Sequence, residues 1–237
     1  MTDTIKRPLL GVLGGMGTQA TACFFEKLHN LQEVTAEQDY LNVLVYSKPS
    51  IPDRTAFITG KSTDNPLASL IQGVKTLEAA GSSLLAVLCV TSHYFYDDLA
   101  KALTVPLLSI TDETALFARE YGISKIGLLA TDGTINSGIF HKSFNKYNIE
   151  VITPTNETRT ELMSMIYSTK LGIDIPMTKL DSMAAGLLDS GAQAVVLGCT
   201  ELSVIAKTGS GYVSRYRSVY IDTLEVLAKA ALERSSS

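Results

Sequence analysis

The sequence predicts an α/β fold of two pseudo-symmetric lobes, each built on a parallel sheet. Short apolar runs alternate with amphipathic helical segments along the 237 residues, which is typical of parallel strands joined by crossover helices. The order of these segments recurs in the second half of the chain at a nearly constant spacing. Ligands of such sheets bind beyond the carboxyl ends of the strands, so we expect the active site in the cleft between the lobes.

The first half opens with an apolar run that ends in Gly14, Gly15 and Gly17 and passes into a helical pattern. A later helix is expected to stop at Gly81, because glycine terminates helices readily. The predicted elements of this half are strands at 9–13, 41–46 and 84–88, helices at 18–28 and 67–80, and a loop at 47–55.

The second half repeats this order. The predicted elements are strands at 126–130, 151–152 and 194–197, a turn at 131–134, a helix at 135–148 and further helices between 157 and 188.

The spacing between the halves indicates a duplication. Gly81 and Gly191 are 110 residues apart, and so are Cys89 and Cys199. Two further pairs agree closely: Gly11 and Gly127 are 116 apart, and Ile110 and Ile221 are 111 apart. We therefore expect one lobe from 1–109 with a C-terminal helix at 216–237 returning to it, and a second lobe from 110–215.

The composition excludes several classes of protein. The net charge is −4, and no basic cluster is large enough to suggest a nucleic-acid partner or an anionic membrane surface. The polar first seven residues and the short apolar run after them fit neither a signal peptide nor a membrane span. Three cysteines are too few for a secreted disulfide framework, so we expect free thiols and a cytoplasmic location.

Cys89 and Cys199 are the strongest candidates for chemistry. Each follows a glycine by eight residues and ends a predicted strand just before an expected helix, whose N-terminus should lower the pKa of the thiol. A buried cysteine is often only a small hydrophobe, and Cys23, inside a helix, is interpreted so. Two thiols on opposite sides of one carbon could remove a proton from one face and return another to the opposite face, which inverts the centre. The histidine and cysteine spacing does not fit a zinc site.

Three motifs resemble one family. The stretch 14–21 reads Gly-Gly-Met-Gly-Thr-Gln-Ala-Thr, the stretch 51–55 reads Ile-Pro-Asp-Arg-Thr, and 198–202 reads Gly-Cys-Thr-Glu-Leu. Together they resemble the aspartate/glutamate racemases, cofactor-independent amino-acid racemases, and in particular the aspartate-racemase-like branch. The resemblance implies racemisation of an amino acid, with aspartate or glutamate preferred. It also implies that Cys89 and Cys199 are the two acid/base residues, that neither pyridoxal phosphate nor metal takes part, and that the protein is a homodimer.

Substrate-binding residues are expected around the two cysteines. Arg54, expected in a loop, would grip a side-chain carboxylate by the family analogy, and Lys170 resembles a lysine of the same branch. The hydroxyls or backbone N–H groups of Thr91, Thr131, Gly133, Thr134 and Thr200 would hold the α-carboxylate, although each threonine could instead be a helix cap. Met16 is expected to line the pocket.

Two residues that follow Cys89 closely in the sequence, Val90 and His93, have more than one possible effect. Val90 stands where the branch has asparagine, so the chain lacks one amide hydrogen bond, and this change is expected to alter substrate choice or turnover. His93 lies one helical turn after Cys89 and either tunes its thiol or is a structural histidine.

Three other functions compete with racemisation. The chain could be an amino-acid-binding regulatory protein without turnover, or an enzyme of the same superfamily similar to a maleate isomerase or a decarboxylase. Gly15, Gly17 and Ala20 also fit a dinucleotide fingerprint, but the second strand ends in Tyr46-Ser47-Lys48 and lacks the acidic residue that such sites need.

Overall fold

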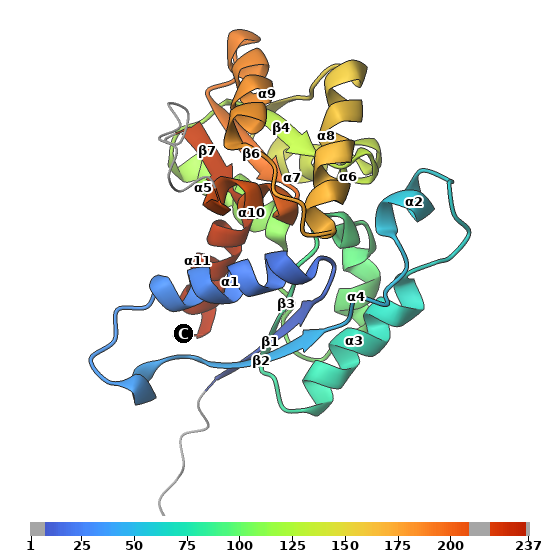
Figure 1. The fold of residues 1–237 in the computed structure, drawn as a ribbon. Helices are drawn as coiled ribbons and strands as arrows, with labels where there is room; N and C mark the ends of the chain where they lie inside the picture. The colour runs from blue at the N-terminus through green and yellow to red at the C-terminus, as the bar shows by residue number, and fades with distance from the viewer. Residues whose placement is uncertain (1–7, 209–218, 236–237) are drawn as a thin grey trace, which may run out of the picture.

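The computed structural model describes residues 8–208 and 219–235, and its strands form two parallel sheets (Figure 1). The first has the strand order β2-β1-β3 and the second the order β5-β4-β6-β7. Their bounds are β1 Leu9–Gly14, β2 Asn42–Ser47, β3 Leu84–Val87, β4 Lys125–Ala130, β5 Glu150–Ile152, β6 Ala194–Gly198 and β7 Tyr220–Asp222. The predicted α/β class with two parallel sheets is confirmed.

The two sheets repeat one another in register. Gly11 of β1 pairs with Leu85, and Gly127 of β4 pairs with Val195, so the partners are again 110 residues apart. β7 continues the second sheet beside β6, whereas at the corresponding edge of the first sheet the described residues form only an isolated bridge, between Leu85 and Leu107. The sequence repeat is therefore a repeat of strand pairing, with a shortened fourth strand in the first sheet.

Helices cover both faces of the sheets and connect the strands. The longer ones are α1 Thr18–Asn30, α3 Leu67–Ala79, α5 Ile110–Glu120, α8 Asn156–Lys170, α9 Met177–Asp189, α10 Thr200–Thr208 and α11 Thr223–Ser235. The shorter ones are α2 Arg54–Ile58, α4 Tyr96–Ala102, α6 Asp132–Ser137 and α7 Ile139–Asn145, with 3-10 turns η1 Glu37–Asp39 and η2 Val90–Phe95.

Two local predictions were wrong. The helix expected at 135–148 begins at Asp132, because the Thr131 side chain caps it, and it breaks at Gly138, whose φ of +66° suits glycine. Arg54 is not in a loop: the Asp53 side chain accepts a hydrogen bond from the Ala56 N–H and starts the short helix α2. In both cases one side chain before the helix accepts the hydrogen bond, and aspartate and threonine in the same position also occur in turns without a helix.

Two helices cross between the halves of the chain. α5 follows the bridging segment at Leu107 and packs against α7, and α11 follows β7 and packs against α1, β1 and β3. β7 itself pairs with β6, and α11 packs on α5, α10 and β6 as well as on α1, β1 and β3, so the end of the chain contacts both sheets. The boundary expected between 215 and 216 lies outside the described residues, and the division into lobes stays a prediction.

Three apolar clusters follow from strand alternation, because successive side chains of a strand point to opposite faces. Leu10 and Val12 of β1 face a central cluster that also contains residues of β4, α7 and α11. Leu13 faces a second cluster under α3, and Leu129 a third under α8 and α9. The central cluster is thus shared by both sheets. In the described ranges, no helix combines the length and apolar character that crossing a membrane requires.

Candidate active site

The two cysteines occupy equivalent places at the carboxyl ends of β3 and β6. Cys89 comes just before η2 and is 6% exposed, and Cys199 comes just before α10 and is 5% exposed. Cys89 packs in the apolar cluster under α3, and Cys199 in the matching cluster under α8 and α9. Both are free thiols. The symmetry of the pair predicted from the sequence therefore extends to their surroundings.

Glu201 is the nearest polar partner of Cys199. The Cys199 thiol donates a hydrogen bond of 3.0 Å to Glu201 Oε2, and the Glu201 side chain is only 2% exposed. Burial, together with the Glu201 carboxylate, raises the pKa of Cys199 well above its usual value. The expectation that a helix N-terminus would lower this pKa was wrong, because desolvation and a nearby negative charge outweigh the helix end.

Lys170 interacts electrostatically with both thiols. Burial lowers the pKa of its ammonium, but Glu201 and the ionised forms of Cys199 and Cys89 more than reverse this effect, so the pKa of Lys170 is raised. One cation from the end of α8 therefore lies within electrostatic reach of both sulfurs. Gly17 makes this packing possible, since a Cβ there would come 2.8 Å from Glu201 Oε1 and 3.7 Å from Lys170 Cγ.

Arg54 is a buried cation close to Cys89. Its Nη1 donates to the carbonyls of Ile51 and Pro52 at 3.1 and 2.9 Å, and its Nη2 to that of Met16 at 3.4 Å. Burial lowers its pKa, but the Cys89 thiolate in particular raises it, and the net shift is upward. The guanidinium therefore lies within electrostatic reach of the Cys89 sulfur. Its Nε is buried and has no hydrogen-bond partner among the described residues.

Three threonine hydroxyls form a buried triangle between distant segments. Thr91 Oγ1 of η2 lies 3.0 Å from Thr131 Oγ1 and 2.9 Å from Thr134 Oγ1, and the Thr134 N–H donates to Thr131 Oγ1. Gly133 allows the close approach, because a Cβ there would lie 2.9 Å from Thr55 Cα. The start of α6 thus packs directly against α2 and η2, and this contact joins the two halves of the chain.

A cavity of about 410 Å³ opens beside Arg54 and Lys170, and the threonine triangle does not line it. Its lining includes Met16, Arg54 and Lys170, so residues from both halves of the chain contribute to it. The two cysteines are not among its lining residues; the cations Arg54 and Lys170, which interact with their sulfurs, form part of its wall. The volume is in the range of small-molecule sites.

Comparison with known proteins identifies the family. The family model described as Asp/Glu/hydantoin racemase matches residues 13–231. The chain belongs to this family. It is 31% identical to the broad-specificity amino-acid racemase RacX of Bacillus subtilis over 150 residues, which are 61% of this chain and 63% of that protein. This alignment spans less than two thirds of the relative's length.

Solved structures of family members share the fold. The aspartate racemase of Picrophilus torridus superposes with a TM-score of 0.79 at 27% identity, covering 97% of this chain and 94% of that one. An aspartate racemase homologue from Pyrococcus horikoshii gives a TM-score of 0.75 at 26% identity, covering 98% and 100%. These proteins belong to a family of racemases, which are isomerases, and the resemblance inferred from the three motifs is confirmed.

The other predicted substrate-binding residues, Thr200 and Val90, differ in their surroundings. Thr200 lies beside the Cys199 and Glu201 pair, with its hydroxyl 3.4 Å from Glu201 Oε2. The Val90 side chain is buried in the central apolar cluster, so a substrate contact from this residue stays a prediction. Glu201 was not among the predicted site residues. Its place in the motif at 198–202, two residues after Cys199, is the sequence signal that could have indicated it.

His93 has a structural role in this family member. The Ile110 N–H donates to its Nε2 at 3.1 Å, so its Nδ1 carries the proton and donates to the Cys89 carbonyl at 3.1 Å. The ring therefore fixes the backbone of Cys89 against the start of α5. Burial lowers the pKa of His93.

This arrangement predicts a pH-dependent stability. An unfolded histidine binds a proton near pH 6.5, whereas the folded one stays neutral to lower pH, so the His93 contribution is complete above about pH 6.5 and is lost as the pH falls. We expect the free energy of unfolding in urea to fall from pH 7 to pH 5, by at most about 1.4 kcal/mol per pH unit from this group. The variant His93→Gln should show a shallower slope. Equal slopes in both proteins would contradict the assignment.

Proposed function

We propose that the protein is an amino-acid racemase, with aspartate or glutamate as substrate, that works by two-base proton transfer between Cys89 and Cys199 without pyridoxal phosphate. The observation that carries the proposal is a pair of buried, unpartnered polar atoms beside the thiols. Arg54 Nε lacks an acceptor and Glu201 Oε1 lacks a donor among the described residues. A substrate with carboxylate and ammonium groups would supply one of each, and orphaned buried groups of this kind call for partners.

The electrostatics suggest how the thiols divide the reaction. We assign the thiolate to Cys89, whose sulfur lies within electrostatic reach of Arg54, and the thiol to Cys199, whose pKa is raised by burial and Glu201. In one direction the Cys89 thiolate takes the α-proton and becomes a thiol, and the Cys199 thiol gives its proton to the opposite face and becomes a thiolate. In the reverse direction the roles exchange. Glu201 is placed to take the Cys199 proton when that thiol must act as the base.

The carbanion between the two steps needs support from fixed donors. The triangle of Thr91, Thr131 and Thr134 offers hydroxyls from both halves of the chain, and we assign the α-carboxylate to it. We assign the side-chain carboxylate to Arg54. A substrate without that carboxylate would leave the buried Nε unpaired, at a cost of about 1–3 kcal/mol, which corresponds to roughly a 5- to 150-fold preference for acidic substrates.

The decisive experiment is a proton-exchange and chiral assay in D₂O. Incubation with L- and D-forms of a panel of amino acids should show inversion of aspartate or glutamate together with deuterium at Cα. A binding protein without turnover would bind and exchange nothing. Maleate and an arylmalonate belong in the same panel, because consumption of either without any amino-acid exchange would favour the other enzymes of the superfamily and overturn the proposal. A homodimer and a cytoplasmic location also stay proposals.

A further inference from the structure

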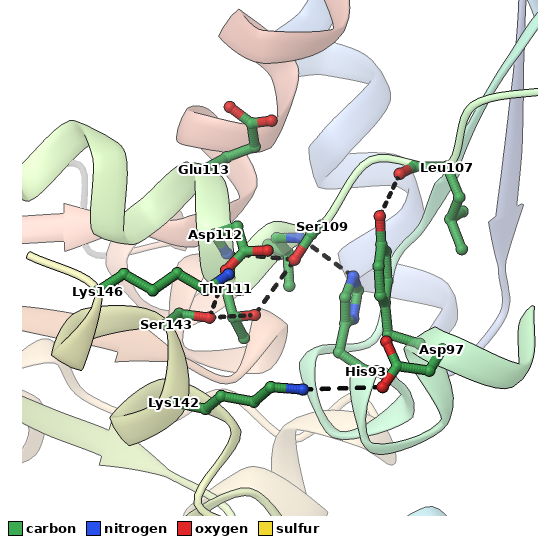
Figure 2. Close-up of polar contacts among 12 residues, drawn as sticks. His93, Asp97, Leu107, Ser109, Thr111, Asp112, Glu113, Lys142, Ser143 and Lys146 are labelled. Carbon is green, nitrogen blue, oxygen red and sulfur yellow. Dashed lines mark hydrogen bonds and ion pairs between the residues drawn. The ribbon is translucent and has the colours of Figure 1, made fainter. Parts of the chain in front are cut away.

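A second cavity of about 290 Å³ lies where η2, α4, the start of α5 and helices α6 and α7 meet. It shares no lining residue with the cavity beside Arg54. Figure 2 shows its polar side chains converging from α4, α5 and α7, with Lys142 and Lys146 on one side and Asp97 on the other. Its volume equals that of roughly ten water molecules at about 30 Å³ each, so it suits a ligand of amino-acid size.

Two ion pairs line this second cavity, and one is much closer than the other. Asp112 accepts hydrogen bonds from Lys146 at 2.6 Å and from Ser143 at 2.7 Å, so its charge is well paired. Lys142 and Asp97 are 3.7 Å apart, and their side chains are 74% and 71% exposed. An exposed pair at this distance contributes little to stability, so exchanging it for contacts to a ligand costs little.

The inner wall of the cavity is polar and ordered. Ser109, Thr111 and Ser143 are buried, and their hydroxyls form a chain with separations of 3.3 and 3.0 Å (Figure 2). Tyr94 supplies a half-exposed aromatic ring to the lining. An apolar ligand would leave these hydroxyls without new partners, so the chemistry favours a small polar molecule.

The same cavity touches supports of the active site from both halves of the chain. His93 lines it and donates to the Cys89 carbonyl, and Ser137 lines it and donates to the Thr134 carbonyl at 2.9 Å. Through these two hydrogen bonds, a ligand bound between α4 and α7 would act on the backbone of Cys89 and on the threonine triangle at the same time.

We propose that this cavity is a second binding site for a small zwitterion of the α-amino-acid type, and that its occupancy modulates the reaction at the two cysteines. The ligand's ammonium pairs with Asp97 and its carboxylate with Lys142. Standard bond lengths place the ammonium nitrogen and carboxylate carbon of an α-amino acid roughly 2.5 Å apart, which suits the 3.7 Å between the two protein charges. The hydroxyl chain faces the remaining polar atoms.

A fluorescent reporter tests the proposal, because the chain contains no tryptophan. In the variant Tyr94→Trp the single indole lies at the cavity, and its half-exposed position tolerates the larger ring. Alanine is the probe, since it lacks the second carboxylate that the proposed active site selects. We expect saturable quenching or enhancement by alanine, and at least tenfold weaker responses to propionate and to ethylammonium, which carry one charge each.

Two further variants decide whether the signal comes from this site. Lys142→Ala and Asp97→Asn, each in the Tyr94→Trp background, should weaken alanine binding at least fivefold, and both side chains are too exposed for their loss to unfold the protein. The proposal is overturned by an absent alanine response, by an equal response to propionate, or by a response that survives both substitutions. Because fluorescence reports binding without turnover, a failure of the racemase assignment would leave this result readable.

Measuring the rate of inversion tests whether occupancy of this cavity modulates the reaction. Alanine should change the initial rate of aspartate or glutamate inversion in the unmodified protein by at least twofold, and Lys142→Ala should abolish this change while retaining basal activity. Binding of alanine without any effect on the rate would overturn the modulating role.

Discussion

Replacing either Cys89 or Cys199 by serine is expected to abolish racemisation. A serine hydroxyl is a far weaker acid than a thiol, so it neither holds a negative charge near neutral pH nor returns a proton readily to the carbanion. General acid/base groups contribute about 10²–10⁴-fold to a reaction, and in the proposed mechanism each direction uses both cysteines. We therefore expect kcat/KM for inversion to fall by at least ~10³-fold in either variant. The measurement is chiral chromatography of the product from each pure enantiomer.

The two serine variants should still differ in proton exchange. The enantiomer whose α-proton faces the remaining cysteine should incorporate deuterium from D₂O without inverting, and the opposite enantiomer should not. The two variants should show opposite preferences. Cys23→Ser is the matched control, because Cys23 is also buried but lies in α1 within the central apolar cluster. Full inversion by the Cys89 or Cys199 variant, or its loss in the Cys23 variant at unchanged thermal stability, would refute the two-thiol mechanism.

The substitution Glu201→Gln is expected to lower kcat/KM for inversion by about 100-fold. The amide has nearly the same size and still meets the Cys199 thiol, but it carries no charge and takes no proton. Cys199 then loses the group that accepts its proton when it acts as the base, and the pKa of its thiol falls because the carboxylate that raised it is gone. Since two enantiomers have equal free energies, kcat/KM must fall by the same factor in both directions.

Proton exchange and the pH profile distinguish this effect from general damage. Deuterium uptake that depends on Cys89 as the base should fall by less than tenfold, and the pH profile of the Cys199-dependent exchange should shift to lower pH. Glu201→Asp, which retains the charge at shorter reach, should recover part of the activity. Glu26→Gln changes an exposed carboxylate in α1 and should leave the rate unaltered. An unchanged pH profile in Glu201→Gln would show that Glu201 does not act on Cys199.

The internal repeat and the ends of the strands could be predicted from the sequence because they depend on local patterns. Apolar runs with glycine turns predicted six of the strands, and the 110-residue spacing of Cys89 and Cys199 placed both thiols at equivalent strand ends, as found. A parallel sheet brings the carboxyl ends of its strands to one edge whatever the loops do. The position of both cysteines at strand ends therefore follows from the sequence alone.

The partners of these thiols depended on how the two halves of the chain pack. Thr91 and Thr134 are 43 residues apart, yet their hydroxyls lie 2.9 Å apart because Gly133 lets α6 approach Thr55. Arg54 is held by the Met16 carbonyl across 38 residues, and Lys170 lies within electrostatic reach of Glu201 from another helix. The reversal of the expected pKa shift at Cys199 has the same origin: burial and a neighbouring charge are properties of the packed interior, and they outweigh the helix end that the local sequence predicts.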